Sequence, residues 1–217
     1  WRFTLATLKF NSGRHPEAVR HIVPYARGLI TAFRSGVVYY SPDGQNLGGG
    51  GRTIRVYGGR TIRGVYGGWE IAAMIPYWNN IITAFSYGAV FSSPNGQNLG
   101  GGGNTTLVYT GTQRVDAMIP YQTGVLTAFS DGSIYYSPDG QNLGGGGSTT
   151  RVYGPGQQVV VMIPYQNGVI AALRSNEIID LEFDVQNPSS GTSTTLVYSG
   201  TQRVDAMIPY QTGVLTA

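Results

Sequence analysis

Residues 115–153 read VDAMIPYQTGVLTAFSDGSIYYSPDGQNLGGGGSTTRVY, and this stretch determines the fold. It holds four short apolar or β-branched runs, each bounded by Gly, Asn, Asp or Pro, which is the pattern of strands separated by turns. No window of helix length combines helical apolar spacing with freedom from Gly and Pro. The stretch therefore predicts a four-stranded antiparallel sheet.

Similar text recurs along the whole chain. A Met/Ile-Ile/Val-Pro-Tyr motif occurs five times, with its prolines at Pro24, Pro76, Pro120, Pro164 and Pro209. The spacings are 52, 44, 44 and 45 residues, and the first is longer because residues 60–68 nearly duplicate residues 52–59. A period of about 40–50 residues with four short strands is typical of a β-propeller blade, which its neighbours cover around a central channel.

We expect one all-β domain over residues 1–217, a five-bladed β-propeller of four-stranded antiparallel blades. The repeat units are about 19–67, 68–112, 113–156 and 157–201, and the fifth, 202–217, is completed by 1–18. Residues 7–10 (TLKF) match the fourth-strand text of residues 106–109 (TLVY). We therefore expect the N-terminal strand to pair with the C-terminal blade and close the ring. Either residues 1–4 supply the missing third strand, or the last blade is short, or the natural protein continues past Ala217.

Composition removes several classes of protein. Charged residues make up 12% of the chain, 33 residues are Gly and none is Cys, which excludes disulfides, thiol nucleophiles and cysteine metal sites. The apolar runs are far shorter than the roughly 20 residues of a membrane helix, so we expect no membrane insertion. The chain starts at Trp1 rather than Met, which suggests a processed chain or a fragment. A removed secretory signal fits this start, and we expect an extracellular or secreted protein.

Charge is distributed unevenly. Up to Arg63 there are ten basic residues and two acidic ones, whereas the remainder has four basic and nine acidic residues. A basic half suggests nucleic acid as a partner. The arginines are dispersed among Gly and apolar residues instead of clustering on one recognition element, so we expect no nucleic-acid partner.

The text SPDGQNL of residues 41–47 recurs as SPNGQNL at 93–99 and as SPDGQNL at 137–143. It resembles the Asp-box of sialidase-like propellers, a Ser-x-Asp-x-Gly turn between third and fourth strands. Here Gly follows Asp directly and Leu replaces the closing aromatic residue. In period, blade number and style of repeat the chain also resembles the five-bladed tachylectin-type lectins, although their Gly-Gly-Trp text is absent. That resemblance implies equivalent sugar sites on successive blades.

Four glycines follow each of these turns. Ordering consecutive glycines is entropically costly, so their recurrence needs a reason. One is a tightly curved connection to the outer strand, and the other is a loop that approaches a ligand closely beside Gln and Asn amides. The Asp of the turn fits a structural role, because it commonly accepts bonds from its own backbone. The candidate sugar-binding residues are Asp43, Gln45, Asn46, Gly48, Gly49, Asn95, Gln97, Asn98, Gly100, Gly101, Asp139, Gln141, Asn142, Gly144 and Gly145.

Two further features bear on sugar binding. The fourth unit keeps Asp184, Gln186 and Asn187 but loses the glycines, so a site there is expected to be weaker or absent. The apolar residues and prolines of the Pro-Tyr motif fit blade core. Its tyrosines and Trp78 could instead stack on sugar faces.

Catalysis is not expected, and we predict no cofactor and no metal. His15 and His21 are the only histidines, and neither lies in a repeated context. Because a scaffold usually diversifies its blades, the sameness of these units favours a multivalent carbohydrate-binding protein, a lectin, whose partners are glycans or glycoproteins. The alternative is a protein-interaction propeller. A glycan-active enzyme is the third reading, and it would use the only cluster of acids, which is Glu177, Asp180, Glu182 and Asp184.

Overall fold

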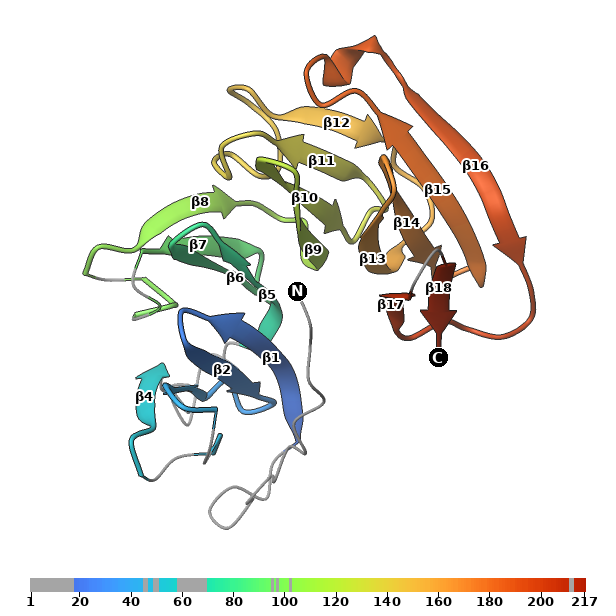
Figure 1. Cartoon of the computed structure of the whole chain (residues 1–217). Coiled ribbons are helices and arrows are strands. Elements are labelled where there is room, and N and C mark those ends of the chain that lie inside the picture. Colours follow the sequence, from blue (N-terminus) through green and yellow to red (C-terminus); the bar gives the residue numbers. More distant parts are fainter. Residues whose placement is uncertain are drawn as a thin grey trace.

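A computed structural model of the chain describes residues 18–44, 47–48, 51–57, 70–94, 96, 98–101, 103–210 and 213–217. They form an all-β fold in which short turns and loops connect the strands (Figure 1). One 3-10 turn, η1 (Pro188–Ser190), is the only helical element of these segments. Within the same segments no helix is long and apolar enough to cross a bilayer.

Four repeat units each form a four-stranded antiparallel sheet with its strands in chain order, which confirms the predicted blade in these units. The fifth unit contributes a two-stranded hairpin among the described residues. The strands are β1 (Val19–Tyr25), β2 (Gly28–Phe33), β3 (Val38–Ser41), β4 (Ile54–Tyr57), β5 (Ile71–Tyr77), β6 (Asn80–Phe85), β7 (Ala89–Ser93), β8 (Thr106–Thr110), β9 (Val115–Tyr121), β10 (Gly124–Phe129), β11 (Ile134–Ser137), β12 (Thr150–Tyr153), β13 (Val159–Tyr165), β14 (Gly168–Leu173), β15 (Glu177–Phe183), β16 (Thr192–Ser199), β17 (Met207–Tyr210) and β18 (Gly213–Thr216).

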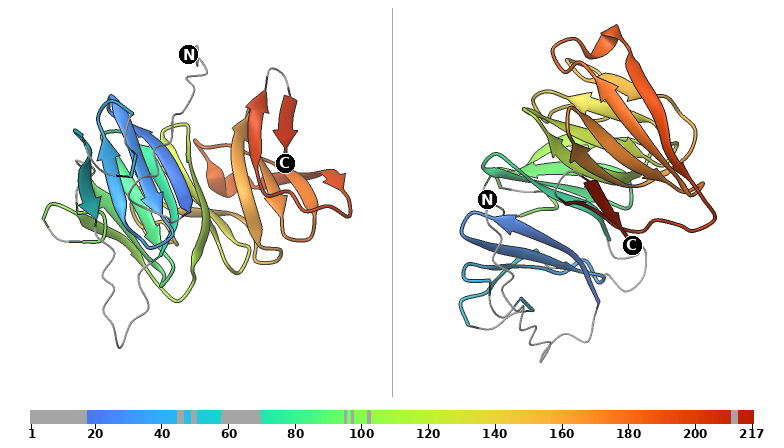
Figure 2. Two further views of the ribbon diagram at one scale, coloured as in Figure 1. Left: turned by 90° about the horizontal axis from the view of Figure 1, so that it is seen from below. Right: turned by 45° about the vertical axis from the view of Figure 1, so that its right-hand side comes forward.

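The sheets follow one another around a common axis in chain order (Figure 1). The first strand of each unit lies nearest the centre and the fourth lies at the periphery. Successive first strands contact each other, from β1 through β5, β9 and β13 to β17. Figure 2 shows the sheets standing side by side as blades.

The hydrophobic core is divided into clusters that lie between successive sheets. Four of the five Pro-Tyr motifs open with a methionine that inserts into the preceding sheet's cluster, and Met74, Met118, Met162 and Met207 are 3–6% exposed. The expectation that the apolar residues of the motif are blade core is confirmed for these methionines and for Val23, Ile75 and Ile163, whereas Ile22 and Ile208 are exposed. The prolines of the motif do not follow it: four of the five are exposed and Pro76 is half-buried.

The two end units expose surfaces that the inner units bury. Ile22 occupies the position of those methionines but is 43% exposed. In the fifth unit Leu215 is 49% exposed, whereas its equivalent Leu126 is 1% exposed. The N-terminal strand expected within residues 1–18 and the insertion at 60–68 lie outside the described residues, apart from Ala18. The count of five blades and the closure of the ring therefore stay predictions.

Candidate functional site

The aspartate of the Ser-Pro-Asp-Gly turn serves the turn itself. Asp139 Oδ1 accepts hydrogen bonds from Ser137 Oγ at 3.1 Å and from the Gln141 backbone N–H at 2.9 Å. Asp43 repeats the first of these bonds with Ser41 Oγ. These bonds fix the chain direction as it leaves the third strand.

The Gln-Asn-Leu-Gly text after the turn forms part of the contact between units. Leu99 and Leu143 are 0% exposed, and each packs in the core shared with the preceding sheet. The Leu143 N–H donates to the Val108 carbonyl of the preceding unit at 3.3 Å. A Cβ on Gly144 would lie 2.2 Å from Tyr109 Cε2, so only glycine fits against that ring. The first glycine of this loop thus has a packing role.

The tyrosines of the Pro-Tyr motif join each unit to the next. The Tyr77 hydroxyl donates to the Thr123 and Pro138 carbonyls of the third unit at 2.7 and 3.4 Å. Tyr25 and Tyr121 make the corresponding bond to the first turn of the unit that follows them. Burial raises the pKa of all three hydroxyls. Tyr121 is 4% exposed, which leaves no ring face for a sugar and makes the stacking hypothesis wrong for this residue.

The predicted sugar-binding residues lie in separate loops, at the end of each sheet where the third strand finishes. Asp43, Asn98, Gly101, Asp139, Gln141, Asn142 and Gly145 are exposed, Gly100 and Gly144 are half-buried, and Gly48 is buried. Gln45, Asn46, Gly49, Asn95 and Gln97 lie outside the described residues. In the third unit Gln141 and Asn142 are consecutive and both exposed, and sugar binding there stays a prediction. We call this end of the sheets the loop face.

Trp78 is the most exposed aromatic residue of the described segments. It lies in the β5–β6 turn on the loop face, with 78% of its surface accessible and its ring edge-on to Tyr77. The equivalent positions carry Ala26, Gln122 and Gln166, so this aromatic surface is not repeated.

The acidic residues of the fourth unit do not converge on one point. Glu177 and Phe183 bound β15, so Glu177 lies at one end of the strand and Asp184 follows the other end. Asp184 accepts a bond from the Gln186 N–H, and Glu177 accepts one from Ser175 Oγ. The described residues contain no group of three His, Cys, Asp or Glu side chains placed to hold a metal ion.

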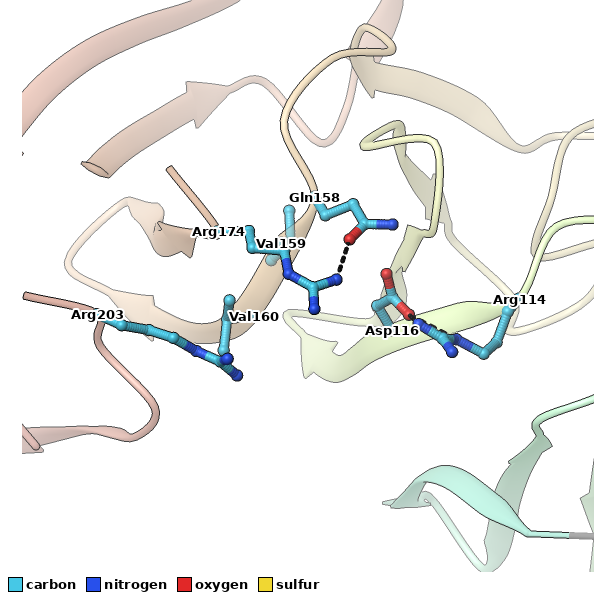
Figure 3. A pocket seen from close by; sticks show the side chains of 7 residues that line it. All are labelled: Arg114, Asp116, Gln158, Val159, Val160, Arg174 and Arg203. Carbon is cyan, nitrogen blue, oxygen red and sulfur yellow. Dashed lines mark hydrogen bonds and ion pairs between the residues drawn. The ribbon is translucent and has the colours of Figure 1, made fainter. Parts of the chain in front are cut away.

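A charged hollow lies at the opposite end of the sheets, where the first strands begin. Its lining comes from three successive units: Arg114, Asp116, Gln158, Val159, Val160, Arg174 and Arg203 (Figure 3). We call it the axis-end pocket. Its volume is about 200 Å³. Arg114 pairs with Asp116 at 2.7 Å, and the Arg174 Nη1 donates to Gln158 Oε1 at 2.7 Å.

At this end the backbone has the same conformation and hydrogen-bond pattern in all four complete sheets. In each of the four complete sheets the first strand has a one-residue register shift near its start. The residue that has no partner on the second strand is Arg20 in β1, Ala72 in β5, Asp116 in β9 and Val160 in β13. Beside each shift, the residue after the second strand donates its N–H to the residue before the first strand at 2.8–3.0 Å. These pairs are Arg34–Ala18, Ser86–Glu70, Ser130–Arg114 and Arg174–Gln158. A constant framework therefore carries side chains of different charge and size, as bulges beside functional sites commonly do.

Sequence reasoning did not single out the axis-end pocket. Its residues lie just before or at the start of the first strands, except Arg174, which follows a second strand. Arg114, Asp116 and Arg203 fall within the near-identical segments 106–128 and 195–217, so nothing in the repeat pattern sets them apart. A comparison of equivalent positions would have pointed to them, because one position carries four residue types, with Arg occurring twice: Ala18, Glu70, Arg114, Gln158 and Arg203.

Searches for related proteins gave matches only among solved structures: no protein-family model matches this sequence, and no curated protein does. The chain is similar to the WD40 β-propeller domain of Doa1, with a TM-score of 0.61 and 15% identity over 93% of this chain and 62% of that one. It is also similar to the computationally designed Ika8 protein, with a TM-score of 0.59 and 13% identity over 93% and 56% of the two chains.

A third similar structure is YCF48 from Cyanidioschyzon merolae, with a TM-score of 0.55 and 12% identity over 83% of this chain and 59% of that chain. This chain thus spans between 56% and 62% of the length of these three solved chains. The likenesses show that the fold is a β-propeller.

Proposed function

We propose that this chain is a non-catalytic protein-interaction propeller that docks a partner protein on the face holding the axis-end pocket. The observation that carries the proposal is the constant framework with changing side chains at this face. Arg20, Ala72, Asp116 and Val160 occupy one structural position, yet they include a cation, an anion and two apolar residues. Such diversification suits a single extended partner that meets each unit differently.

The loops that join the third strand to the fourth, such as residues 138–149, are nearly identical in the first three units, and this near-identity has a structural explanation. Asp139 holds its own turn, Leu143 fills the core between units and Gly144 admits the Tyr109 ring. In the third unit these residues hold the turn and pack against the second unit, so the repetition of the loop in the first three units has a structural reason and does not by itself point to repeated ligand sites. Among the similar solved chains, YCF48 is bound to the D1 peptide in a second structure, an example of a propeller with a polypeptide ligand.

Multivalent glycan binding is the second candidate function, and exposed groups on the loop face favour it. Asn98, Gln141 and Asn142 are exposed, and Trp78 offers a flat apolar ring of the kind that packs on sugar faces. Glycans or glycoproteins would then be the partners, and an extracellular location would suit them.

One experiment separates the two functions. The purified chain is tested in parallel against a displayed peptide library and a glycan array. The protein-interaction proposal expects selected peptides whose binding falls when Arg174 and Arg203 are changed to Ala, and it expects no loss from the triple Ala variant of Gln45, Gln97 and Gln141. Glycan binding lost in the triple variant, without any selected peptide, would establish the lectin instead.

We also infer that five units form a ring closed by residues 1–18. The exposed Ile22 and Leu215 support this inference, because the equivalents of Ile22 are buried against a preceding sheet and Leu126, the equivalent of Leu215, is buried against a following one. A chain lacking residues 1–17 is expected to melt at a lower temperature, and a synthetic 1–17 peptide should restore the loss. An unchanged melting temperature after truncation would contradict the closure.

A further inference from the structure

The arginines of the axis-end pocket differ in how their charge is matched. Arg114 directs both Nε and Nη2 to Asp116 Oδ1, at 2.9 and 2.7 Å. Arg203 Nε pairs with Asp205 Oδ1 at 2.7 Å. Arg174 instead donates to Gln158, an amide without charge. Of the three arginines among the described lining residues, Arg114 and Arg203 are therefore paired with carboxylates, whereas Arg174 is hydrogen-bonded to a neutral side chain.

Arg174 is held in position by a chain of hydrogen bonds. Gln158 Nε2 donates to the Ser130 carbonyl at 2.7 Å, which fixes the amide so that its Oε1 accepts from Arg174 Nη1 at 2.7 Å. The remaining N–H groups of the guanidinium belong to an exposed side chain at the pocket (Figure 3). A guanidinium oriented in this way loses little side-chain entropy when it binds an anion.

Further charged side chains surround the pocket. Arg20 forms an ion pair with Glu70, and burial followed by the charges of Arg34 and Arg114 lowers its pKa. The arginines of the first unit are thus within electrostatic reach of those at the pocket. The five arginines at this end of the sheets, Arg20, Arg34, Arg114, Arg174 and Arg203, are matched in number by five carboxylates, those of Glu70, Asp116, Asp131, Glu177 and Asp205, so the formal charges of these described side chains balance.

The size of the hollow indicates what it can hold. Its 200 Å³ is less than the roughly 300–1,000 Å³ of pockets that enclose whole small ligands. A single side chain of a larger partner fits this volume better. Val159 and Val160 supply the apolar part of the wall, against which the methylene groups of a glutamate can pack.

We propose that the axis-end pocket binds a carboxylate side chain of an acidic polypeptide segment, with Arg174 as its main contact and Arg203 as the second. The inference rests on the proposed protein-interaction function and names the chemistry of the partner. The guanidinium of Arg174 can bind a carboxylate through two parallel hydrogen bonds, an arrangement that ammonium groups do not match.

The test uses fluorescence anisotropy with a labelled peptide of alternating Glu and Gly, and its isostere of alternating Gln and Gly. We expect the Glu peptide to bind about tenfold more tightly or better, because hydrogen bonds to charged groups contribute about 1.5–3 kcal/mol. Its affinity should fall as salt is raised. The Arg174→Ala variant should lose about tenfold, and Arg174→Lys should fall between it and the unchanged protein.

Arg27→Ala is the matched control, because it removes the same charge from an exposed position on the loop face. We expect less than a twofold effect from it. Equal losses in the Arg27 and Arg174 variants would reduce the binding to overall charge and overturn the inference, as would equal binding of the Glu and Gln peptides. Preference for a uronic-acid oligosaccharide over the Glu peptide would also overturn it. Displayed peptides that bind through this face without Asp or Glu would refute the carboxylate ligand while leaving the proposed function intact.

Discussion

A Cβ atom built on Gly144 would lie 2.2 Å from Cε2 of Tyr109, so the glycine loop of the third unit packs tightly against the fourth strand of the second unit at this pair. The contact joins two residues 35 positions apart in the sequence. It explains why the first glycine of the loop cannot carry a side chain.

The Gly144→Ala variant is therefore expected to lose about 1–3 kcal/mol of unfolding free energy, the usual cost of overpacking. For a chain of this length that lowers the melting temperature by about 2–4 °C per kcal/mol. Calorimetry measures the change. Gly154→Ala is the control, because a Cβ at that position has no neighbour within 4 Å. Equal effects of the two substitutions would show that the Tyr109 contact is unimportant.

The hydroxyl of Tyr77 provides the second prediction. Tyr77→Phe removes its bonds to the Thr123 and Pro138 carbonyls and should cost about 1 kcal/mol. Tyr153→Phe should leave the unfolding free energy unchanged, since the Tyr153 hydroxyl makes no hydrogen bond within the described part of the chain. Urea unfolding of both variants gives the comparison. A Tyr77→Phe midpoint equal to that of the unchanged chain would mean that these bonds do not stabilise the junction.

Unpaired hydroxyls inside the sheets provide the third prediction. Thr31, Thr83 and Thr127 are 0% exposed, and their Oγ1 atoms have no hydrogen-bond partner among the described residues. Thr127→Val replaces the hydroxyl by a methyl group of similar size and should stabilise the fold by about 1 kcal/mol. Thr149→Val, which removes a bond to the Gln141 carbonyl, should not. Destabilisation by Thr127→Val in urea would indicate that this hydroxyl is satisfied.

Asp180 provides a pH-dependent prediction. Burial, and after it the charge of Glu182, raises the pKa of its carboxyl, and its Oδ1 is buried without a partner. The folded state therefore holds this proton more tightly than the unfolded state. Protonated Asp180 therefore stabilises the folded state. This stabilisation is complete at pH values below the pKa that the group has in the unfolded chain, and it is lost as the pH rises through the higher pKa of the folded chain.

Asp180→Asn, which keeps the shape and removes the charge, should raise the melting temperature at pH 7 and change it little near pH 3. Asp184→Asn is the control, because that carboxylate accepts a bond from the Gln186 N–H and should not gain stability at pH 7. The melting temperatures of both variants and of the unchanged chain are compared at both pH values. An equal gain at pH 7 and pH 3 would exclude the ionisation of Asp180 as its cause.

The sequence predicts the local parts of the structure well and the contacts between units poorly. The spacing of the Pro-Tyr motif predicts four-stranded sheets because strand length and turn residues are local properties. The partner of Tyr109 lies in the next unit, so the glycine loop is open to both a structural and a ligand-binding interpretation until the sheets are placed. Arg174 and Gln158 likewise become neighbours only through the pairing of β13 with β14.

The junctions between units also bear on how such a chain changes its length. Every tyrosine that reaches forward, such as Tyr77, meets a turn that the following unit supplies, as Tyr121 does one unit later. A duplicated unit brings both halves of the junction with it, so the new copy can repeat the tyrosine contact on either side. Gene duplication can thus add blades one at a time, while substitutions at the axis end give each new copy its own recognition chemistry.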